Sequence, residues 1–131
     1  MRTAEHIIPV RWGDQDAFGH VNNSIIARYV EDARVHFLSA IGMDMRPGVP
    51  HGPILADIHI AFRRPLFFPD TVHVTTRVAH IGTTSLTLEH TLQNDAGKLI
   101  ADATDVIVYY DYTASHKEPL PDDIRRLALG S

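Results

Sequence analysis

Apolar and polar residues alternate along much of the chain, and this period of two predicts β-strands. The first such stretch covers residues 6–13, where Ile8, Val10 and Trp12 fall on one face. Pro9 lies within it and has no backbone N–H. We therefore expect this strand at an edge of the sheet, where a missing donor is tolerated. A short irregular stretch rich in turn-forming residues follows it.

The spacing then changes to that of an α-helix, with apolar residues at intervals of three and four over about five turns. Asn22 or Asn23 is a suitable N-cap, because a short polar side chain can accept a hydrogen bond from the first free N–H groups. Gly42 is expected to end this helix. Residues 43–53 contain two glycines and three prolines and are predicted to be a loop.

Four further stretches with period-two or continuous apolar patterns follow, at about residues 54–62, 72–78, 86–92 and 98–110. Residues 94–97, Asn-Asp-Ala-Gly, predict a hairpin turn between the last two. The final stretch is apolar on both faces, which is typical of a strand inside a sheet. Because the connections are short, these strands are expected to pair antiparallel.

The order of one strand, one long helix and four strands predicts an α+β fold. In it, one face of an antiparallel sheet of about five strands wraps the helix. The other face or an edge is then left for a partner subunit, so we expect an oligomer. Residues 1–131 are interpreted as a single domain, because no linker divides the chain and its length suits one core. Residues 113–131 are expected to be a polar tail with one helical turn near residues 124–127.

Composition narrows the functional classes. The 12 Lys and Arg against 16 Asp and Glu give a net charge of −4, which disfavours a nucleic-acid-binding protein. The absence of cysteine excludes disulfides, cysteine–zinc sites and a cysteine nucleophile. The nine histidines show no H-E-x-x-H motif and no close ligand spacing, so no metal site is predicted. The first residues contain no long apolar run, so we expect neither a signal peptide nor a membrane span, and a cytoplasmic protein.

The densest group of polar side chains is Asp14, Asp16, His20, Asn22 and Asn23, between the first strand and the long helix. A carboxylate beside the free N–H groups of a helix N-terminus offers both a base or nucleophile and donors for an oxyanion. Acyl transfer or hydrolysis uses both. The same residue types are also common in any turn from a strand to a helix, so a purely structural role remains an alternative.

Residues 11–23 read RWGDQDAFGHVNN, and ARYVEDAR follows in the helix. This run resembles the signature of the 4-hydroxybenzoyl-CoA thioesterase-like branch of the hotdog-fold superfamily. Residues 80–89, HIGTTSLTLE, resemble the turn and fourth strand of that family more weakly. The similarity covers roughly residues 5–112. The family's founding enzymes lack the His-Val-Asn-Asn run, so this chain is more similar to the broader acyl-CoA thioesterase group.

The resemblance implies hydrolysis of an acyl-CoA thioester without a metal or redox cofactor. The carboxylate that does the chemistry falls on Asp16, which would act as a nucleophile or as a general base for water. The donor that polarises the carbonyl falls on the backbone N–H of Asn23. The family's active sites lie between the subunits of a homodimer or homotetramer. Residues expected at the substrate are His20, Asn22, Arg63, Thr83, Thr84 and Ser85. Structural alternatives are a histidine packed in the turn, a solvated arginine at a strand end, and a hairpin with exposed hydroxyls at residues 83–85.

Two other functions remain open from the sequence. A non-catalytic hotdog protein that binds acyl-CoA or CoA would show ligand-dependent stabilisation without turnover. A hotdog dehydratase or hydratase would change an enoyl double bond without releasing a thiol. Both are disfavoured by the intact D-x-D pattern at Asp14 and Asp16. Acyl length and aromatic preference are not readable from the chain.

Overall fold

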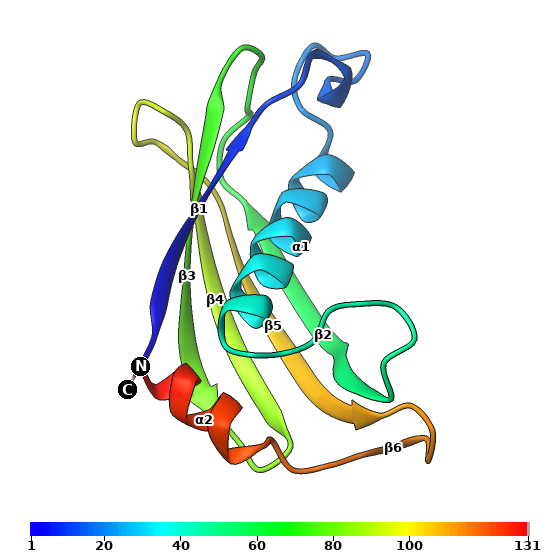
Figure 1. Ribbon diagram of the computed structural model, residues 1–131. Helices are drawn as coiled ribbons and strands as arrows, with labels where there is room; N and C mark the ends of the chain where they lie inside the picture. Colours follow the sequence, from blue (N-terminus) through cyan, green and yellow to red (C-terminus); the bar gives the residue numbers. More distant parts are fainter. Residues whose placement is uncertain (131) are drawn as a thin grey trace.

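The structure is a computed structural model that describes residues 1–130. A curved antiparallel sheet lies behind one long helix (Figure 1). The elements are β1 (Thr3–Pro9), the 3-10 helix η1 (Trp12–Asp14), α1 (Asn23–Ala40), β2 (His51–Phe62), β3 (Thr71–Ile81), β4 (Ser85–Gln93), β5 (Leu99–Asp111), β6 (His116–Lys117) and α2 (Asp122–Leu129).

The strands follow the order β1-β3-β4-β5-β2, and the short β6 pairs with the end of β5. Every pairing is antiparallel. The prediction that Pro9 belongs to an edge strand is confirmed, since β1 pairs with no described strand other than β3. The prediction that the last long strand lies inside the sheet is also confirmed, because β5 sits between β4 and β2. This is the hotdog arrangement, with α1 held against one face of the sheet (Figure 1).

The helix α1 begins where its cap chemistry predicts. The Oδ1 atom of Asn22 accepts a hydrogen bond from the Ser24 N–H at 2.8 Å, so Asn22 is the N-cap. Gly42 follows the helix with φ +98°, a conformation that favours glycine, and its N–H bonds to the Ser39 carbonyl. Phe37 and Leu38 are fully buried against the sheet. Each such side chain stabilises the fold by about 1.5–3 kcal/mol through removal of apolar surface from water.

Four polar side chains lie inside the core beneath α1. Arg34 of the helix donates from Nε to Oδ2 of Asp105 on β5 at 2.7 Å. His90 of β4 lies 2.7 Å from the same oxygen through Nε2, and its Nδ1 lies 2.8 Å from the Thr76 hydroxyl. The network therefore connects α1 to three neighbouring strands. The network fixes both where the helix lies on the sheet and how deeply the helix is buried.

Three predicted boundaries were wrong. The first strand begins at Thr3 and ends at Pro9, because residues 12–14 form η1. The strand after the loop begins at His51, three residues earlier than predicted, because Gly52 and Pro53 pair with β5. The expected single turn in the polar tail is the eight-residue helix α2, and it buries Ile124 and Ala128 against the end of the core.

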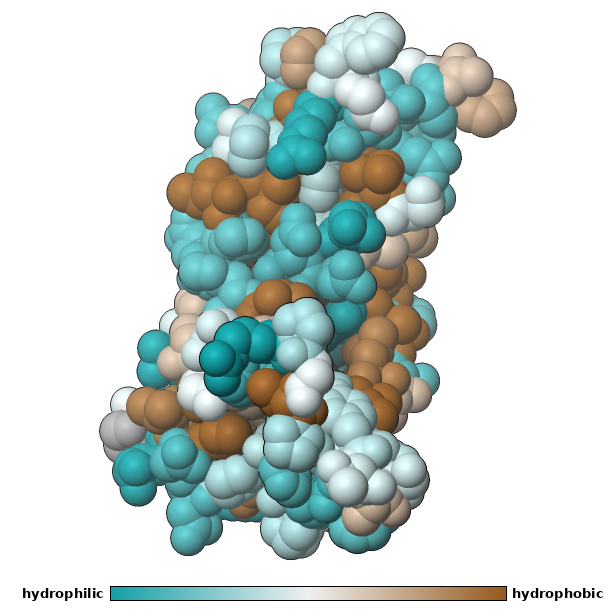
Figure 2. All heavy atoms as spheres, turned by 45° about the vertical axis from the view of Figure 1, so that its right-hand side comes forward, coloured by the Kyte–Doolittle hydropathy of each residue, from teal (hydrophilic) through white to brown (hydrophobic). Residues whose placement is uncertain are grey.

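The strand β2 is the other edge of the sheet, and it is largely uncovered. Within residues 1–130 its only strand partner is β5, and most of its side chains are exposed on both faces. Ile54, Leu55, Ile58 and Phe62 are among the exposed large apolar residues of the molecule. Apolar side chains form a band on this side of the molecule (Figure 2). A long apolar edge strand of this kind ordinarily has a covering partner.

Candidate active site

The loop between β1 and α1 is tied to the segment that follows β2. The Val10 N–H donates to the Asp70 carbonyl at 2.9 Å, and the Val21 N–H donates to the Leu66 carbonyl at 2.7 Å. Between these anchors, Gln15 and Val21 form an isolated antiparallel bridge. A short turn therefore projects from a fixed base, which is a common way to position reacting side chains.

Asp16 opens this turn. Its backbone N–H donates to the His20 carbonyl at 3.0 Å, and its carbonyl accepts from the Gly19 N–H at 3.1 Å. Its carboxylate accepts two hydrogen bonds, from the Phe18 N–H to Oδ1 at 2.9 Å and from the Asn22 amide to Oδ2 at 3.2 Å. The side chain is half-buried. Both oxygens are thus held in place while the group stays accessible.

Asp14 has a different role from Asp16. Its Oδ2 atom accepts hydrogen bonds from the Arg11 N–H at 2.9 Å and from the Tyr29 hydroxyl at 2.5 Å. Its carbonyl accepts from the Asn22 N–H at 3.1 Å. Burial, and then the hydrogen bond to Asp14, raise the pKa of Tyr29 above its usual value, so the phenol stays protonated and remains a donor. Asp14 therefore fastens the loop to α1.

Asn23 is the first residue of α1, and its backbone N–H takes part in none of the hydrogen bonds found among the described residues. The first N–H groups of a helix have no partner within it, and they lie at the positive end of its dipole. The Asn22 side chain connects the helix start to Asp16, because its oxygen bonds to the Ser24 N–H and its amide bonds to the Asp16 carboxylate. A carboxylate and a free donor therefore flank the same helix terminus.

A hollow of about 250 Å³ lies beside this terminus, between the start of α1 and the end of β2. His20 lies in its wall, and an edge contact with Phe67, at 6.5 Å between ring centroids, supports the imidazole. On its other side His20 stacks with Phe18, at 6.4 Å. Phe18 is 86% exposed. The lining residues are His20, Val21, Asn23, Ile26, Phe62, Arg63, Arg64, Pro65 and Leu66.

Arg63 lies in the same wall, but its guanidinium is already paired. Nε donates to Oδ2 of Asp102 at 2.7 Å, and Nη2 donates to Oδ1 at 3.3 Å. This pairing lowers the pKa of Asp102 and keeps the pair charged. Arg64 is exposed beside it, and no ion pair found among the described residues engages its side chain. Because Asp102 balances the charge of Arg63, the positive charge at the rim of the hollow comes from Arg64.

Thr83, Thr84 and Ser85 do not join the Asp16 loop within one chain. Thr83 and Thr84 lie in the turn between β3 and β4 and Ser85 begins β4, whereas the loop is anchored near the beginning of β3. Figure 1 shows the two regions at opposite ends of the sheet. The eleven residues of β3 separate them by about 33 Å of strand. Their contact with a substrate held at Asp16 therefore requires a second subunit.

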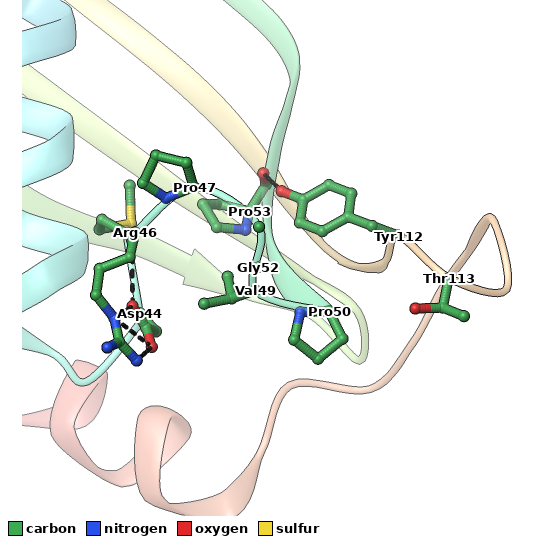
Figure 3. Close-up of a pocket in the computed structure, with 11 residues that line it drawn as sticks. Asp44, Arg46, Pro47, Val49, Pro50, Gly52, Pro53, Tyr112 and Thr113 are labelled. Carbon is green, nitrogen blue, oxygen red and sulfur yellow. Dashed lines mark hydrogen bonds and ion pairs between the residues drawn. The ribbon is translucent and has the colours of Figure 1, made fainter.

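A second, larger hollow of about 560 Å³ also lies away from Asp16. The loop from Asp44 to Pro50 forms one side, and Tyr112 and Thr113 form the other (Figure 3). Its wall is held by the Asp44–Arg46 ion pair and by the hydrogen bond from the Tyr112 hydroxyl to the Pro53 carbonyl.

The stacking of Phe18 on His20 was not predicted, because sequence spacing gives no signal for which loop aromatic stays exposed.

Comparisons with known proteins identify the family of this chain. The model of the thioesterase-like superfamily matches residues 10–127. The chain is 26% identical over 118 residues to a 1,4-dihydroxy-2-naphthoyl-CoA hydrolase of Thermosynechococcus vestitus, covering 88% of this chain and 81% of the relative.

Two solved structures extend the comparison. The PA2801 protein of Pseudomonas aeruginosa, a candidate thioesterase, superposes with a TM-score of 0.88 at 34% identity, covering 94% of this chain and 95% of that one. SAV2348 of Staphylococcus aureus, solved in complex with CoA, gives 0.92 at 15% identity over 98% and 83%, which shows the shared fold. Among the described residues, no helix is long and apolar enough to cross a membrane.

Proposed function

The chain belongs to the thioesterase-like superfamily of thioester hydrolases, and from this premise we propose that it hydrolyses an acyl-CoA at the Asp16 loop. The observation that carries the proposal is the pairing of two groups at one helix terminus. The Asp16 carboxylate is oriented by the Phe18 N–H and the Asn22 amide, and the free N–H of Asn23 begins the same helix.

The chemistry proceeds by attack at the thioester carbonyl. As a nucleophile, an oxygen of Asp16 would bond to the carbonyl carbon, the C–S bond would break, and CoA thiolate would leave; water would then cleave the resulting anhydride. As a general base, Asp16 would take a proton from water, whose oxygen would bond to the carbonyl carbon as the thiolate leaves. Both routes consume one water and yield a free acid and CoA. We propose Asp16 as the reacting group in either.

The proposed role of Asn23 is to stabilise the charge that develops on the carbonyl oxygen. A backbone N–H at the positive end of a helix is a strong donor for an oxyanion, and it needs no rearrangement at the moment of reaction. Loss of one such donor typically costs about two to three orders of magnitude in rate. The hollow beside Asn23 supports this placement, since the carbonyl would enter from that side.

The proposed substrate is an acyl-CoA whose acyl group enters the hollow lined by His20 and Phe62. The Arg63 and Arg64 rim suits the phosphate groups of CoA, because guanidinium groups form charge-assisted hydrogen bonds with phosphate oxygens. The naphthoyl-CoA hydrolase relative and the CoA-bound structure of the same fold support a CoA thioester over other esters. His20 is proposed to contact the acyl group.

We also propose that the working form is a homodimer, or a tetramer built from it, joined along β2. The unpaired edge of β2 and its exposed apolar side chains Ile54, Leu55 and Ile58 support this assembly. Antiparallel pairing of two β2 edges about a twofold axis would set the His51 end of one strand against the Phe62 end of the other. The far end of the partner's sheet, with its Thr83–Ser85 turn, would then approach the Asp16 loop. That arrangement would complete the substrate site.

The direct test of this function is thiol release from a panel of short, long and aromatic acyl-CoAs, followed with a thiol-reactive dye. The chain has no cysteine, so the protein adds no background signal. Turnover of at least one acyl-CoA supports the proposal, and the panel then names the acyl class. Ligand-dependent thermal stabilisation without thiol release would instead identify a binding protein. A change at an enoyl double bond without thiol release would identify a hydratase.

A further inference from the structure

Three side chains with metal-binding chemistry converge at the end of the sheet that lies away from Asp16. His51 opens β2, Asp111 ends β5, and Glu118 follows β6. His51 and Asp111 are directly opposite in the β2–β5 pairing, and Asp111 is opposite His116 in the β5–β6 pairing. Directly paired residues project from the same face of a sheet. The fold therefore brings together His51 and Glu118, which are 67 residues apart in sequence.

The distances between the ligand atoms suit a single small cation. One nitrogen of His51 and one oxygen each of Asp111 and Glu118 all lie within 4.8 Å of one another. His51 Nδ1 and Glu118 Oε1 are 2.5 Å apart. Nitrogen and oxygen ligands around a tetrahedral zinc ion, at bond lengths of about 2.0–2.1 Å, are about 3.3 Å from each other. Small rotations of the exposed His51 side chain and the half-buried Asp111 and Glu118 side chains would bring the three ligand atoms to this spacing.

Backbone contacts hold two of the ligands in position. Oδ1 of Asp111 accepts hydrogen bonds from the Thr113 N–H at 2.9 Å and the Ala114 N–H at 3.0 Å, which leaves Oδ2 for a ligand. The Glu118 N–H donates to the Tyr109 carbonyl at 3.0 Å, which fixes its strand beside β5. Asp111 is therefore held through its side chain and Glu118 through its backbone.

Several carboxylates elsewhere in the molecule pair with arginine, as in Asp44–Arg46, Asp102–Arg63 and Glu89–Arg77. No ion pair found among residues 1–130 joins Asp111 or Glu118 to a lysine or arginine, and His51 is the basic partner of Glu118. The two carboxylates thus have an imidazole beside them but no permanently charged lysine or arginine partner among the described residues.

We propose that His51, Asp111 and Glu118 form a binding site for a divalent transition-metal ion of the Zn²⁺ type. One imidazole nitrogen with two carboxylate oxygens is a donor set that zinc accepts, whereas Mg²⁺ and Ca²⁺ prefer oxygen alone. The three protein ligands leave one tetrahedral position for water. A bound ion would join the start of β2 to the segment that leads into α2.

His73 provides a matched comparison within the same chain. It also lies between two carboxylates, with Nδ1 3.6 Å from Glu5 and Nε2 3.1 Å from Asp95. Those carboxylates flank opposite nitrogens of the ring, so they cannot converge on one ion. His73 therefore shares the composition of the proposed site without its geometry.

The test is isothermal titration calorimetry of the untagged full chain with ZnCl2 in a non-chelating buffer. The wild type is expected to bind one Zn²⁺ per chain, and His51→Gln and Glu118→Gln are each expected to weaken that affinity about tenfold or more. His73→Gln is expected to leave it unchanged. Thermal unfolding without metal checks that each variant is folded. The proposal is overturned if the wild type shows no saturable binding, or if the His51 and Glu118 variants bind as the wild type does.

Discussion

The amide of Asn22 donates to Oδ2 of Asp16 at 3.2 Å, while its oxygen accepts the Ser24 N–H at 2.8 Å. One side chain therefore caps α1 and holds the carboxylate that we propose to be catalytic. This explains why two asparagines at a helix start are more than turn formers here. It also means that helix capping and carboxylate orientation can be separated by substitution.

Asn22→Asp is the substitution that separates them. Aspartate keeps the oxygen that caps the helix, so stability should change by less than about 1 kcal/mol. The donor to Asp16 is lost, and a like charge takes its place. We expect kcat for thiol release to fall about tenfold or more. Asn22→Ala is the companion variant and should lose both activity and about 1 kcal/mol of stability. Full activity in Asn22→Asp would show that the asparagine only caps the helix.

The buried ion pair between Arg34 and Asp105 leads to a stability prediction. Asp105→Asn leaves the Arg34 guanidinium nearly buried without its counter-charge, so unfolding free energy should fall by about 3–5 kcal/mol. Asp102→Asn is the matched control on the same strand, because its pair with Arg63 is exposed and should be worth less than about 1 kcal/mol. Urea unfolding of both variants measures the difference. Equal losses would contradict this account of the network.

The same residue predicts a pH dependence. Burial alone would raise the pKa of Asp105, but hydrogen bonds from His90 and Arg34 outweigh it and hold that pKa below the usual value. In the unfolded chain the pKa returns to about 3.9. Asp105 therefore stabilises the fold above about pH 4, and this contribution is lost as pH falls further, toward the folded pKa. Unfolding followed from neutral to acidic pH should show this loss in the wild type and a smaller one in Asp105→Asn.

The proposed dimer predicts different results at the two edges of the sheet. Ile58 on β2 is 39% exposed and Ile7 on β1 is 55% exposed, so a lysine at either position should leave the subunit folded. Ile58→Lys would bury a charge against the apolar side chains of the partner's β2 across the proposed interface. We expect it to yield monomers by light scattering and to lose most thiol release, whereas Ile7→Lys should stay dimeric and active. A monomeric wild type at micromolar concentration would contradict the assembly.

Local chemistry accounts for the parts of the fold that the sequence predicted. Pro9 placed β1 at an edge, Asn22 began α1, and Asn94 with Gly97 formed the hairpin turn, where Gly97 has φ +79°. In each case the backbone at one position has a requirement that the residue type found there meets and that neighbouring residue types do not. The helix α2 was underestimated, because two buried residues, Ile124 and Ala128, give too short a periodic signal.

The features that sequence reasoning missed depend on strand register. His51 and Asp111 meet because β2 pairs with β5, and no spacing along the chain reports that pairing. Thr83 falls in a motif that resembles the family's, yet it lies at the opposite end of the sheet from Asp16, since β3 carries the chain away from the loop. The Asp16 loop itself was predictable because its groups are neighbours in sequence.

The measurement that tests the central claim most directly is thiol release by Asp16→Asn beside Asp14→Asn. Asp16→Asn is expected to lower kcat by about a hundredfold or more with its thermal stability nearly unchanged. Asp14→Asn should lose stability, since Asp14 accepts from the Tyr29 hydroxyl and the Arg11 N–H, while retaining most of its turnover. Equal turnover by Asp16→Asn and the wild type would contradict the account and assign the chemistry to another residue.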